Sequence, residues 1–326
     1  MSNPFSAEKS KAGEGSIYLA LLPPSTPRLR TVRYQYPLKL VSPAPITVDT
    51  QLVHTVYLLT YGGGLVAGDA IDLDVHVEAD TRLTLLTQGS TKLFKSPNRE
   101  LGSRQCMTTA LDPGAALCYL PDPVQPFDKS CFDQSQIYNC AARQHDAMGS
   151  LCVLDWVSNG RSANGEDWSF YRYSSRNEIW LLHAGQRRLL LRDNLVLDDH
   201  GETGSITSRM NGLSVFGTLF LYGPLYKRLA DFFMSEFKLH PRIGGRQWND
   251  SEVEQERDHT TAWRDRRQQR EVSQNFLWSA ASIRGCVTVK FGARELEHAR
   301  HWLYDMLSFE GTIVNNFGER ALLCLR

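Results

Sequence analysis

Four acidic residues of this chain stand in or beside stretches that read as β-strands, where carboxylates can bind a cation. They are Asp69, Asp155, Glu166 and Asp193. Oxygen ligands and water hold a divalent transition metal weakly and release it readily, so such residues suit a metal in transit better than a stored cofactor. Asp155 interrupts an apolar run (154–157), and an inward side chain there needs a partner or water.

Ion pairing offers a purely structural interpretation of the same residues. The planar guanidinium of Arg161 suits a carboxylate, and either Asp155 or Glu166 is close enough in sequence to receive it. The segment 192–195 repeats the theme, with Arg192 and Asp193 set between apolar strand residues. A buried Arg192–Asp193 pair is the corresponding structural interpretation there.

The glycine-rich run GGGLVAGD (62–69) does not fit a nucleotide site. Gly63 and Gly68 have the five-residue offset of a phosphate loop, but Asp69 and Ala70 stand where that loop needs Lys and Ser or Thr. A carboxylate beside a triphosphate is repelled. A strand pattern follows the run instead of the helix that a dinucleotide fingerprint requires. The run is therefore predicted to be a strand-to-strand turn whose glycines take positive φ or let another backbone approach.

Other catalytic and metal-binding patterns are weak. No Gly-x-Ser-x-Gly elbow or Cys/His signature is present, and the seven cysteines are scattered without a Cys-x-x-Cys pair, which argues against a zinc site. Such cysteines fit a reduced, intracellular setting. His298 and His301 lie three apart and can share a metal, but they fall on the polar side of a predicted helix, where solvent exposure is the simpler interpretation.

Composition narrows the class of protein. The 326 residues carry 36 Lys plus Arg and 36 Asp plus Glu, and a net charge of zero gives no general attraction to nucleic acid or to an anionic membrane. The N-terminus lacks the apolar core of a signal peptide, and the longest uncharged stretch (213–226) is too short to span a bilayer. We expect a cytoplasmic protein with a disordered tail at 1–15 and a single β-rich domain at 16–326.

The elements that must position the acidic residues are mostly strands. Short runs with strand character and turn residues between them continue for over 100 residues, which indicates an all-β body: a sandwich, a barrel or a β-helical stack. The runs are 104–110, 116–120, 135–141, 151–157, 168–173, 177–183 and 188–197. A proline-stiffened segment, PDPVQPF (121–127), contains Asp122 and is predicted to be an ordered loop closing one end of the body.

The C-terminal half combines strands with helices. Strands are predicted at 215–222 and 285–292, each followed by a helix, at 225–237 and 293–307, with apolar residues on one helical face. Between these units, an insertion at about 241–275 is dense in charge, acidic first and basic later. We interpret it as solvated or disordered and helical in its second half; the alternative is an arm that docks a partner.

Several motifs together resemble the urease accessory protein D family (UreD, called UreH in some bacteria). GGGLVAGD (62–69) is followed by TQGSTKLF (87–94), and DWVSNGR (155–161) by GEDW (165–168), in the order that the family shows. The PDPVQPF segment also resembles a family segment. Bacterial members are generally more compact over 241–275, so the resemblance is to a eukaryotic, fungal-like member.

The resemblance implies both a fold and a role. The family's fold is mainly β, a β-helical arrangement of stacked sheets with two helices in the C-terminal half. Its members are not enzymes but maturation chaperones and scaffolds: they bind UreF-type and UreG-type accessory proteins, dock on apo-urease and help to pass nickel to its active site, by a proposed internal tunnel. The resemblance implies no tightly bound cofactor, with nickel only in transit. Carboxylates that face inward would line its path, Asp155 and Glu166 first, then Asp69 and Asp193. The alternative is a β-solenoid hydrolase using paired carboxylates, which requires two acids converging on an open cleft.

Overall fold

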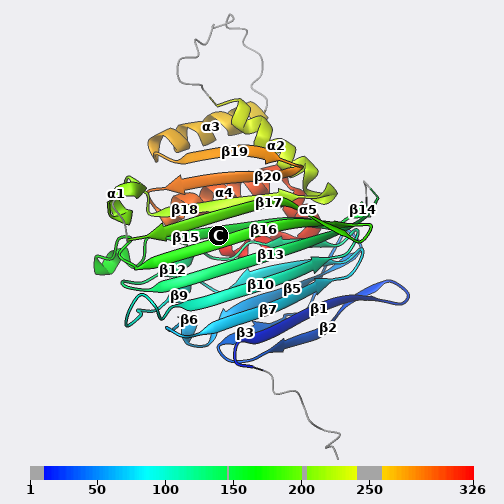
Figure 1. Ribbon diagram of the computed structural model, residues 1–326. Helices are drawn as coiled ribbons and strands as arrows, with labels where there is room; N and C mark the ends of the chain where they lie inside the picture. The colour runs from blue at the N-terminus through cyan, green and yellow to red at the C-terminus, as the bar shows by residue number, and fades with distance from the viewer. Residues whose placement is uncertain (1–10, 145–146, 200–203, 241–258) are drawn as a thin grey trace, which may run out of the picture.

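Two stacked β-sheets form the body of the protein, as a computed structural model shows (Figure 1). The structure describes residues 11–144, 147–199, 204–240 and 259–326. The first part of the charged insertion, 241–258, and most of the predicted tail, 1–10, lie outside these residues. The first strand begins at Glu14, two residues before the predicted start of the domain.

Sheet A has eight strands in the described part of the chain, in the order β17-β16-β13-β10-β7-β1-β2, with β14 paired to β13. Its strands are β1 (Glu14–Leu22), β2 (Thr26–Tyr34), β7 (Ala70–Val77), β10 (Ser103–Leu111), β13 (Cys131–Gln144), β14 (Ala147–Met148), β16 (Arg172–His183) and β17 (Gln186–Asp198). The runs predicted at 168–173 and 177–183 prove to belong to one strand, β16, preceded by a loop.

Sheet B has twelve strands among the described residues, with the main order β19-β20-β18-β15-β11-β8-β5-β3. Its strands are β3 (Leu38–Val41), β4 (Ile46–Val48), β5 (Gln51–Thr60), β6 (Gly64–Leu65), β8 (Arg82–Thr87), β9 (Thr91–Leu93), β11 (Ala116–Tyr119), β12 (Val124–Pro126), β15 (Ser150–Ser158), β18 (Val215–Tyr222), β19 (Leu277–Ile283) and β20 (Cys286–Ala293).

The chain winds between the two sheets, which makes the body β-helical. It passes from β7 to β8, β10, β11, β13, β15 and β16, changing sheet at each step. Neighbours within each sheet are parallel along this path. Antiparallel strands then extend both sheets, β17 beside β16 and β18, β20 and β19 beside β15. The prediction of a mainly β, stacked-sheet body is confirmed.

Helices cover the face of sheet B that points away from sheet A. They are α2 (Lys227–Lys238), α3 (His259–Ser273), α4 (Leu296–Glu310) and α5 (Thr312–Phe317), while α1 (Ile206–Met210) lies in a connection. The two helices predicted from apolar spacing correspond to α2 and α4. The helix expected in the second half of the insertion corresponds to α3, whereas α1 and α5, also present among the described residues, were not predicted. None of the helices described here is long and apolar enough to cross a membrane.

Strand β15 shows why its sequence is apolar almost throughout. Leu151, Val153 and Val157 face the core between the sheets, while Cys152 and Leu154 face the core beneath the helices. A strand buried on both faces reads as a continuous apolar run instead of an alternating one. The same period of two places Asp155 on the side that faces sheet A.

The second half of the charged insertion forms α3 and is partly buried, despite its many charged residues. In α3 the side chains of Trp263, Arg267 and Glu271 are buried, and Arg267 pairs with Glu271 and with Glu236 of α2. The predicted helix is present, but solvent exposure is wrong for these residues. Opposite charges on two facing helices neutralise one another, which lets them enter the core.

Candidate functional site

Asp155 lies between the two sheets, where three neutral side chains of sheet A donate hydrogen bonds to it. Ser175 Oγ and Asn177 Nδ2 each lie 2.6 Å from its Oδ2, and Gln134 Nε2 lies 3.1 Å from its Oδ1. Gln134 Nε2 also lies 3.0 Å from Ser175 Oγ, which ties the donors together. In the part of the chain that the structure describes, no Lys, Arg or His side chain pairs with this carboxylate; of the two partners predicted for Arg161, the structure shows Glu166 and not Asp155.

Burial and hydrogen bonding act on the pKa of Asp155 in opposite directions. Burial raises the pKa because it removes water from the charged form, while the bonds from Ser175, Asn177 and Gln134 lower it. The nearby negative charge of Asp193 adds to the rise, and the net pKa lies above the ordinary value of 3.8. A cation beside this carboxylate would therefore lower its pKa and replace the missing positive charge.

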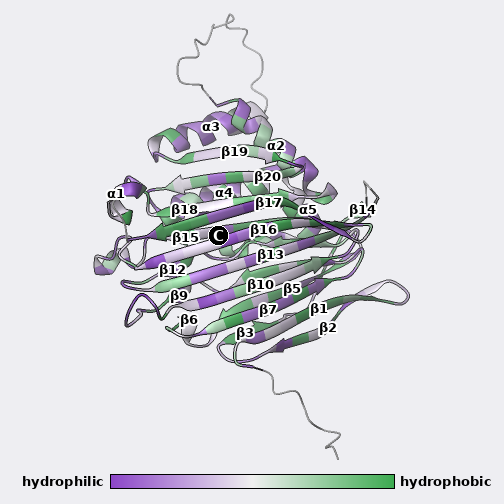
Figure 2. Cartoon of the chain, viewed as in Figure 1, coloured by the Kyte–Doolittle hydropathy of each residue, from purple (hydrophilic) through white to green (hydrophobic). Residues whose placement is uncertain are grey.

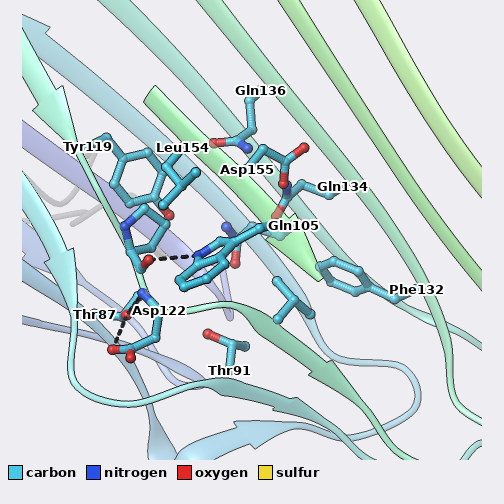
Figure 3. A pocket seen from close by; sticks show the side chains of 13 residues that line it. Thr87, Thr91, Gln105, Tyr119, Asp122, Phe132, Gln134, Gln136, Leu154 and Asp155 are labelled. Carbon is cyan, nitrogen blue, oxygen red and sulfur yellow. Dashed lines mark hydrogen bonds between the residues drawn. The ribbon is translucent and has the colours of Figure 1, made fainter. Parts of the chain in front are cut away.

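A small cavity adjoins Asp155 (Figure 3). Its volume is about 20 Å³, and a site of that size holds about one water molecule. The lining is largely polar and comes from both sheets. It includes Thr87, Thr91, Gln105, Tyr119, Asp122, Gln134, Gln136 and Asp155.

Asp122 separates this cavity from a pocket at the surface. It accepts hydrogen bonds from Thr87 Oγ1 at 3.0 Å and from the backbone N–H of Gly89 at 2.9 Å. On its other side it pairs with Arg300 of α4 at 2.7 Å. Thr87 and Asp122 line both the cavity and a surface pocket of about 470 Å³, which Cys324 also lines. Asp122 thus stands in the wall between solvent and Asp155.

Asp193 belongs to the same space between the sheets. It pairs with Lys290 of β20 at 2.6 Å, so this ion pair bridges sheet A and sheet B. Its neighbour in the sheet is Asn177, which also donates to Asp155. The predicted Arg192–Asp193 pair is wrong, because adjacent residues of a strand point to opposite faces. Arg192 pairs with Glu178 on the outer face, at 2.9 Å.

Glu166 and Asp69 lie elsewhere and have structural partners. The Arg161 side chain clamps Glu166 and lowers its pKa, and the same guanidinium lies 3.9 Å from the centre of the Phe127 ring. Asp69 accepts a hydrogen bond from the N–H of Val66 at 2.9 Å and closes the glycine-rich turn. Neither residue lines the cavity beside Asp155. The structure therefore brings together Asp155 and Asp193 but not all four carboxylates.

The glycine-rich turn has the geometry expected of a strand connection. Gly62, Gly63 and Gly68 have φ of 74°, 75° and 91°. Gly64 has an extended φ, but a Cβ there would lie 2.3 Å from Lys92 O, so the backbones of β6 and β9 approach closely. The spacing of glycines in this run thus serves packing and turn formation.

The described residues form neither a metal site of the usual kind nor the paired-acid site of a hydrolase. No group of three or more His, Cys, Asp or Glu within these ranges is arranged to hold a metal ion. His298 lies 3.5 Å from Glu295 of the preceding turn. A hydrolase needs two acids on an open cleft, whereas Asp155 adjoins a cavity of about 20 Å³ and Glu166 lies outside that cavity, held by Arg161, so the two acids do not fit that alternative.

Sequence reasoning named Asp122 but did not give it a role at the site. The signal was the placement of an acid within a proline-stiffened segment, which was interpreted as an ordered loop. That segment leads from β11 to β13 and contains β12, and it also carries Asp122 to the edge of the cavity. Its partner Arg300 lies 178 residues further along the chain, so spacing cannot reveal the pair.

The fold and the site together define a class of protein: a β-helical body of two stacked sheets with a carboxylate between them that lacks a cationic partner among the described residues. A family model described as UreD urease accessory protein matches residues 14–320. The chain therefore belongs to the UreD urease accessory protein family.

Relatives in fungi and plants agree with that assignment. An uncharacterized urease accessory protein ureD-like of Schizosaccharomyces pombe is 31% identical, over 88% of this chain and 91% of the relative. Urease accessory protein 4 of Cryptococcus neoformans is 30% identical, over 92% and 91%. Urease accessory protein D of Oryza sativa subsp. indica is 31% identical over 63% of each chain.

Proposed function

We propose that this chain is a non-enzymatic chaperone and scaffold of urease maturation. It acts in the cytoplasm with UreF-type and UreG-type accessory proteins, docks on apo-urease and assists the delivery of nickel. Membership of the UreD family supports a role in urease maturation, and the relatives are named accessory proteins. Nickel in this proposal is cargo and passes the space between the sheets.

One observation carries the nickel path: the carboxylate of Asp155 lies between the sheets and accepts hydrogen bonds from three neutral donors, but it pairs with no cationic side chain among the described residues. Asp193, Glu166 and Asp122 each have a Lys or Arg partner. A carboxylate already paired with a cation has little attraction left for a metal ion, whereas the carboxylate of Asp155 has no such partner in the described part of the chain. Oxygen ligands bind nickel weakly, which suits passage.

The path would connect the surface pocket, Asp122 and Asp155. Thr87 and Asp122 form the wall, and Asp193 lies beyond Asn177 on the other side of Asp155. The cavity of about 20 Å³ is too small for a hydrated ion with its full shell, so passage requires the wall to open or the ion to exchange waters for protein oxygens. Glu166 and Asp69, outside this line, contribute to the fold in this proposal.

The test is urease activation in cells that make this chain with UreF-type and UreG-type proteins and apo-urease. Asp155→Ala and Asp155→Asn should lower the nickel content and the activity of urease at least tenfold, while the accessory complex still co-purifies. Asp133→Asn is the matched control, because Asp133 is an exposed strand carboxylate paired with Arg172 on the outer face. Glu166→Ala should act only through stability.

Two results would contradict the proposal. If urease gains nickel equally well without this chain, the role in maturation is wrong. If Asp155→Ala leaves activation unchanged in a stably folded protein, the carboxylate path is wrong.

A further inference from the structure

Sheet A ends in a long strand, and one edge of that strand has no strand partner among the described residues. Strand β17 is the last strand of its sheet, and β16 is the one strand that pairs with it in the described part of the chain. Its Val196 is 51% exposed. An exposed edge strand presents unpaired N–H and C=O groups to any extended segment that approaches.

The backbone groups at this edge can be assigned. Asp198 O accepts a hydrogen bond from the side chain of Arg209, which lies outside the sheet, so this carbonyl points away from β16. Since the direction alternates along a strand, the N–H groups of Asn194 and Val196 point the same way. Leu189 O, on the far side of a bulge, accepts from Arg284 at 3.0 Å. Two arginines thus occupy the ends of the edge, and no second strand of the described chain pairs with the stretch 190–197 between them.

Beside this edge, sheet B extends one strand further than sheet A. Lys290 pairs with Asp193, which places β20 opposite β17, and β19 lies beyond β20 (Figure 1). The side of β19 that continues this inner face is exposed along its whole length. Its residues are Leu277, Ser279, Ala281 and Ile283, which we call the β19 ledge.

The β19 ledge exposes two large apolar side chains to solvent, one at each end of the strand. Leu277 is 60% exposed and Ile283 is 48% exposed. On the opposite face of the same strand, Ala280 is buried and Trp278 packs against the helices. A strand added to the β17 edge would lie over the ledge at the normal spacing between stacked sheets, about 10 Å. It would bury these side chains and complete the layer.

The charges around this site favour an acidic occupant. Arg187, Arg188 and Arg284 are all exposed near the β16–β17 and β19–β20 turns. Figure 2 shows hydrophilic stretches along β17 and paler colours on β19. A segment that carries acidic residues at this end would be steered to the edge and held there.

A second copy of this chain fits the edge poorly. Direct pairing of two β17 strands would bring the two sheet B layers together as well. Because β19 projects one strand beyond β17 in each copy, the two β19 strands would occupy the same space. The gap admits an inserted strand instead.

We propose that the β17 edge and the β19 ledge form a docking groove for an extended, acidic segment of a partner protein in the maturation assembly. The segment pairs with the N–H groups of Asn194 and Val196 and sets alternate apolar side chains on Leu277, Ala281 and Ile283. Its acidic residues face Arg187, Arg188 and Arg284. This inference rests on the proposed function, since that function supplies the assembly.

Hydrogen exchange tests the groove directly, on the full chain alone and in the purified assembly with UreF-type and UreG-type proteins and apo-urease. The amides of 190–197 should exchange at least tenfold more slowly in the assembly. Val196→Pro removes an outward N–H without touching the ladder to β16 and should raise the dissociation constant about tenfold. Val196→Thr keeps the N–H and should bind as the unaltered chain does.

The ledge has its own matched pair of variants, which keeps the test valid if the proline variant misfolds. Leu277→Asp should weaken the assembly at least tenfold, whereas Val272→Asp, on an exposed position of α3, should not. If the assembly forms and activates urease but the amides of 190–197 exchange as fast as in the chain alone, the docking groove is wrong while the proposed function stands. Equal binding by Leu277→Asp and Val272→Asp would lead to the same conclusion. Failure of the unaltered chain to assemble would contradict the proposed function and this inference with it.

Discussion

Replacing Arg267 by Met should destabilise the protein by about 3 kcal/mol, because two buried carboxylates would lose a shared cation. Arg267 is 2% exposed, and its guanidinium lies 2.6 Å from Glu271 and 2.9 Å from Glu236. Breaking a buried pair costs about 3–5 kcal/mol. We take the lower value because Glu236 keeps Arg264 and Glu271 keeps a hydrogen bond from Trp302.

The deficit should depend on pH. Burial raises the pKa of Glu271, but the bonds from His240 and Trp302 and the charge and bond of Arg267 outweigh it, so the pKa lies below 4.5. A lowered pKa contributes stability above 4.5 that is lost as the pH falls through the folded value. Arg267→Met lacks the part of this stability that Arg267 contributes. The loss in its free energy of unfolding should therefore be complete at pH 7.5 and should become smaller below about pH 4.5.

Urea unfolding, followed by tryptophan fluorescence at pH 7.5 and pH 4, measures both effects. Arg266→Met is the matched control, since Arg266 is exposed on the same helix and should change the free energy of unfolding by less than about 0.5 kcal/mol. A deficit for Arg267→Met below about 1 kcal/mol at pH 7.5 would refute the argument that α3 is anchored by this network. Equal deficits for the two variants would refute it as well.

Two further predictions concern the turn and the thiols. Gly64→Ala should lower the free energy of unfolding by about 2–3 kcal/mol, because its Cβ would lie 2.3 Å from Lys92 O. Gly62→Ala should lower it by about 1–2 kcal/mol, because Gly62 has a φ of 74° but open space around it. Similar values for the two variants in urea titrations would contradict the close approach of the β6 and β9 backbones at Gly64. A thiol reagent should modify half-buried Cys106 in the native protein but not the buried Cys140 or Cys286. Burial raises the pKa of Cys286 to about 12 and that of Cys140 further, so neither thiol ionises readily. Peptide mass spectrometry measures the modification, and rapid modification of Cys286 would show that the core opens.

The sequence was sufficient where one local rule dominates. The turn at 62–69 followed from its glycines, and α2 and α4 followed from apolar spacing. Strand β15 was visible as an apolar run because both of its faces are buried. These features depend on residues a few positions apart, so periodicity detects them.

Long-range pairing was out of reach for the same method. The burial of Arg267 depends on Glu236, 31 residues earlier, and the partners of Asp155 come from two other strands of the opposite sheet. Strand β19 was missed because its inner face is exposed and its pattern is not that of a core strand. The Arg192–Asp193 pair is different: the period-2 rule alone excludes it, since neighbours on a strand face opposite sides.

The contrast between Asp155 and its neighbours bears most on function. A fold that needed only polar filling between its sheets would be served by amides and hydroxyls, and Gln134, Ser175 and Asn177 already supply them. An ionised carboxylate at that position costs free energy unless something compensates its charge, and burial indeed raises its pKa. Elsewhere in the described core, Lys290, Arg161 and Arg300 provide that compensation for other acids. Since Asp155 has only neutral donors, its charge is the feature that packing does not explain, and a passing cation is the partner that its chemistry favours.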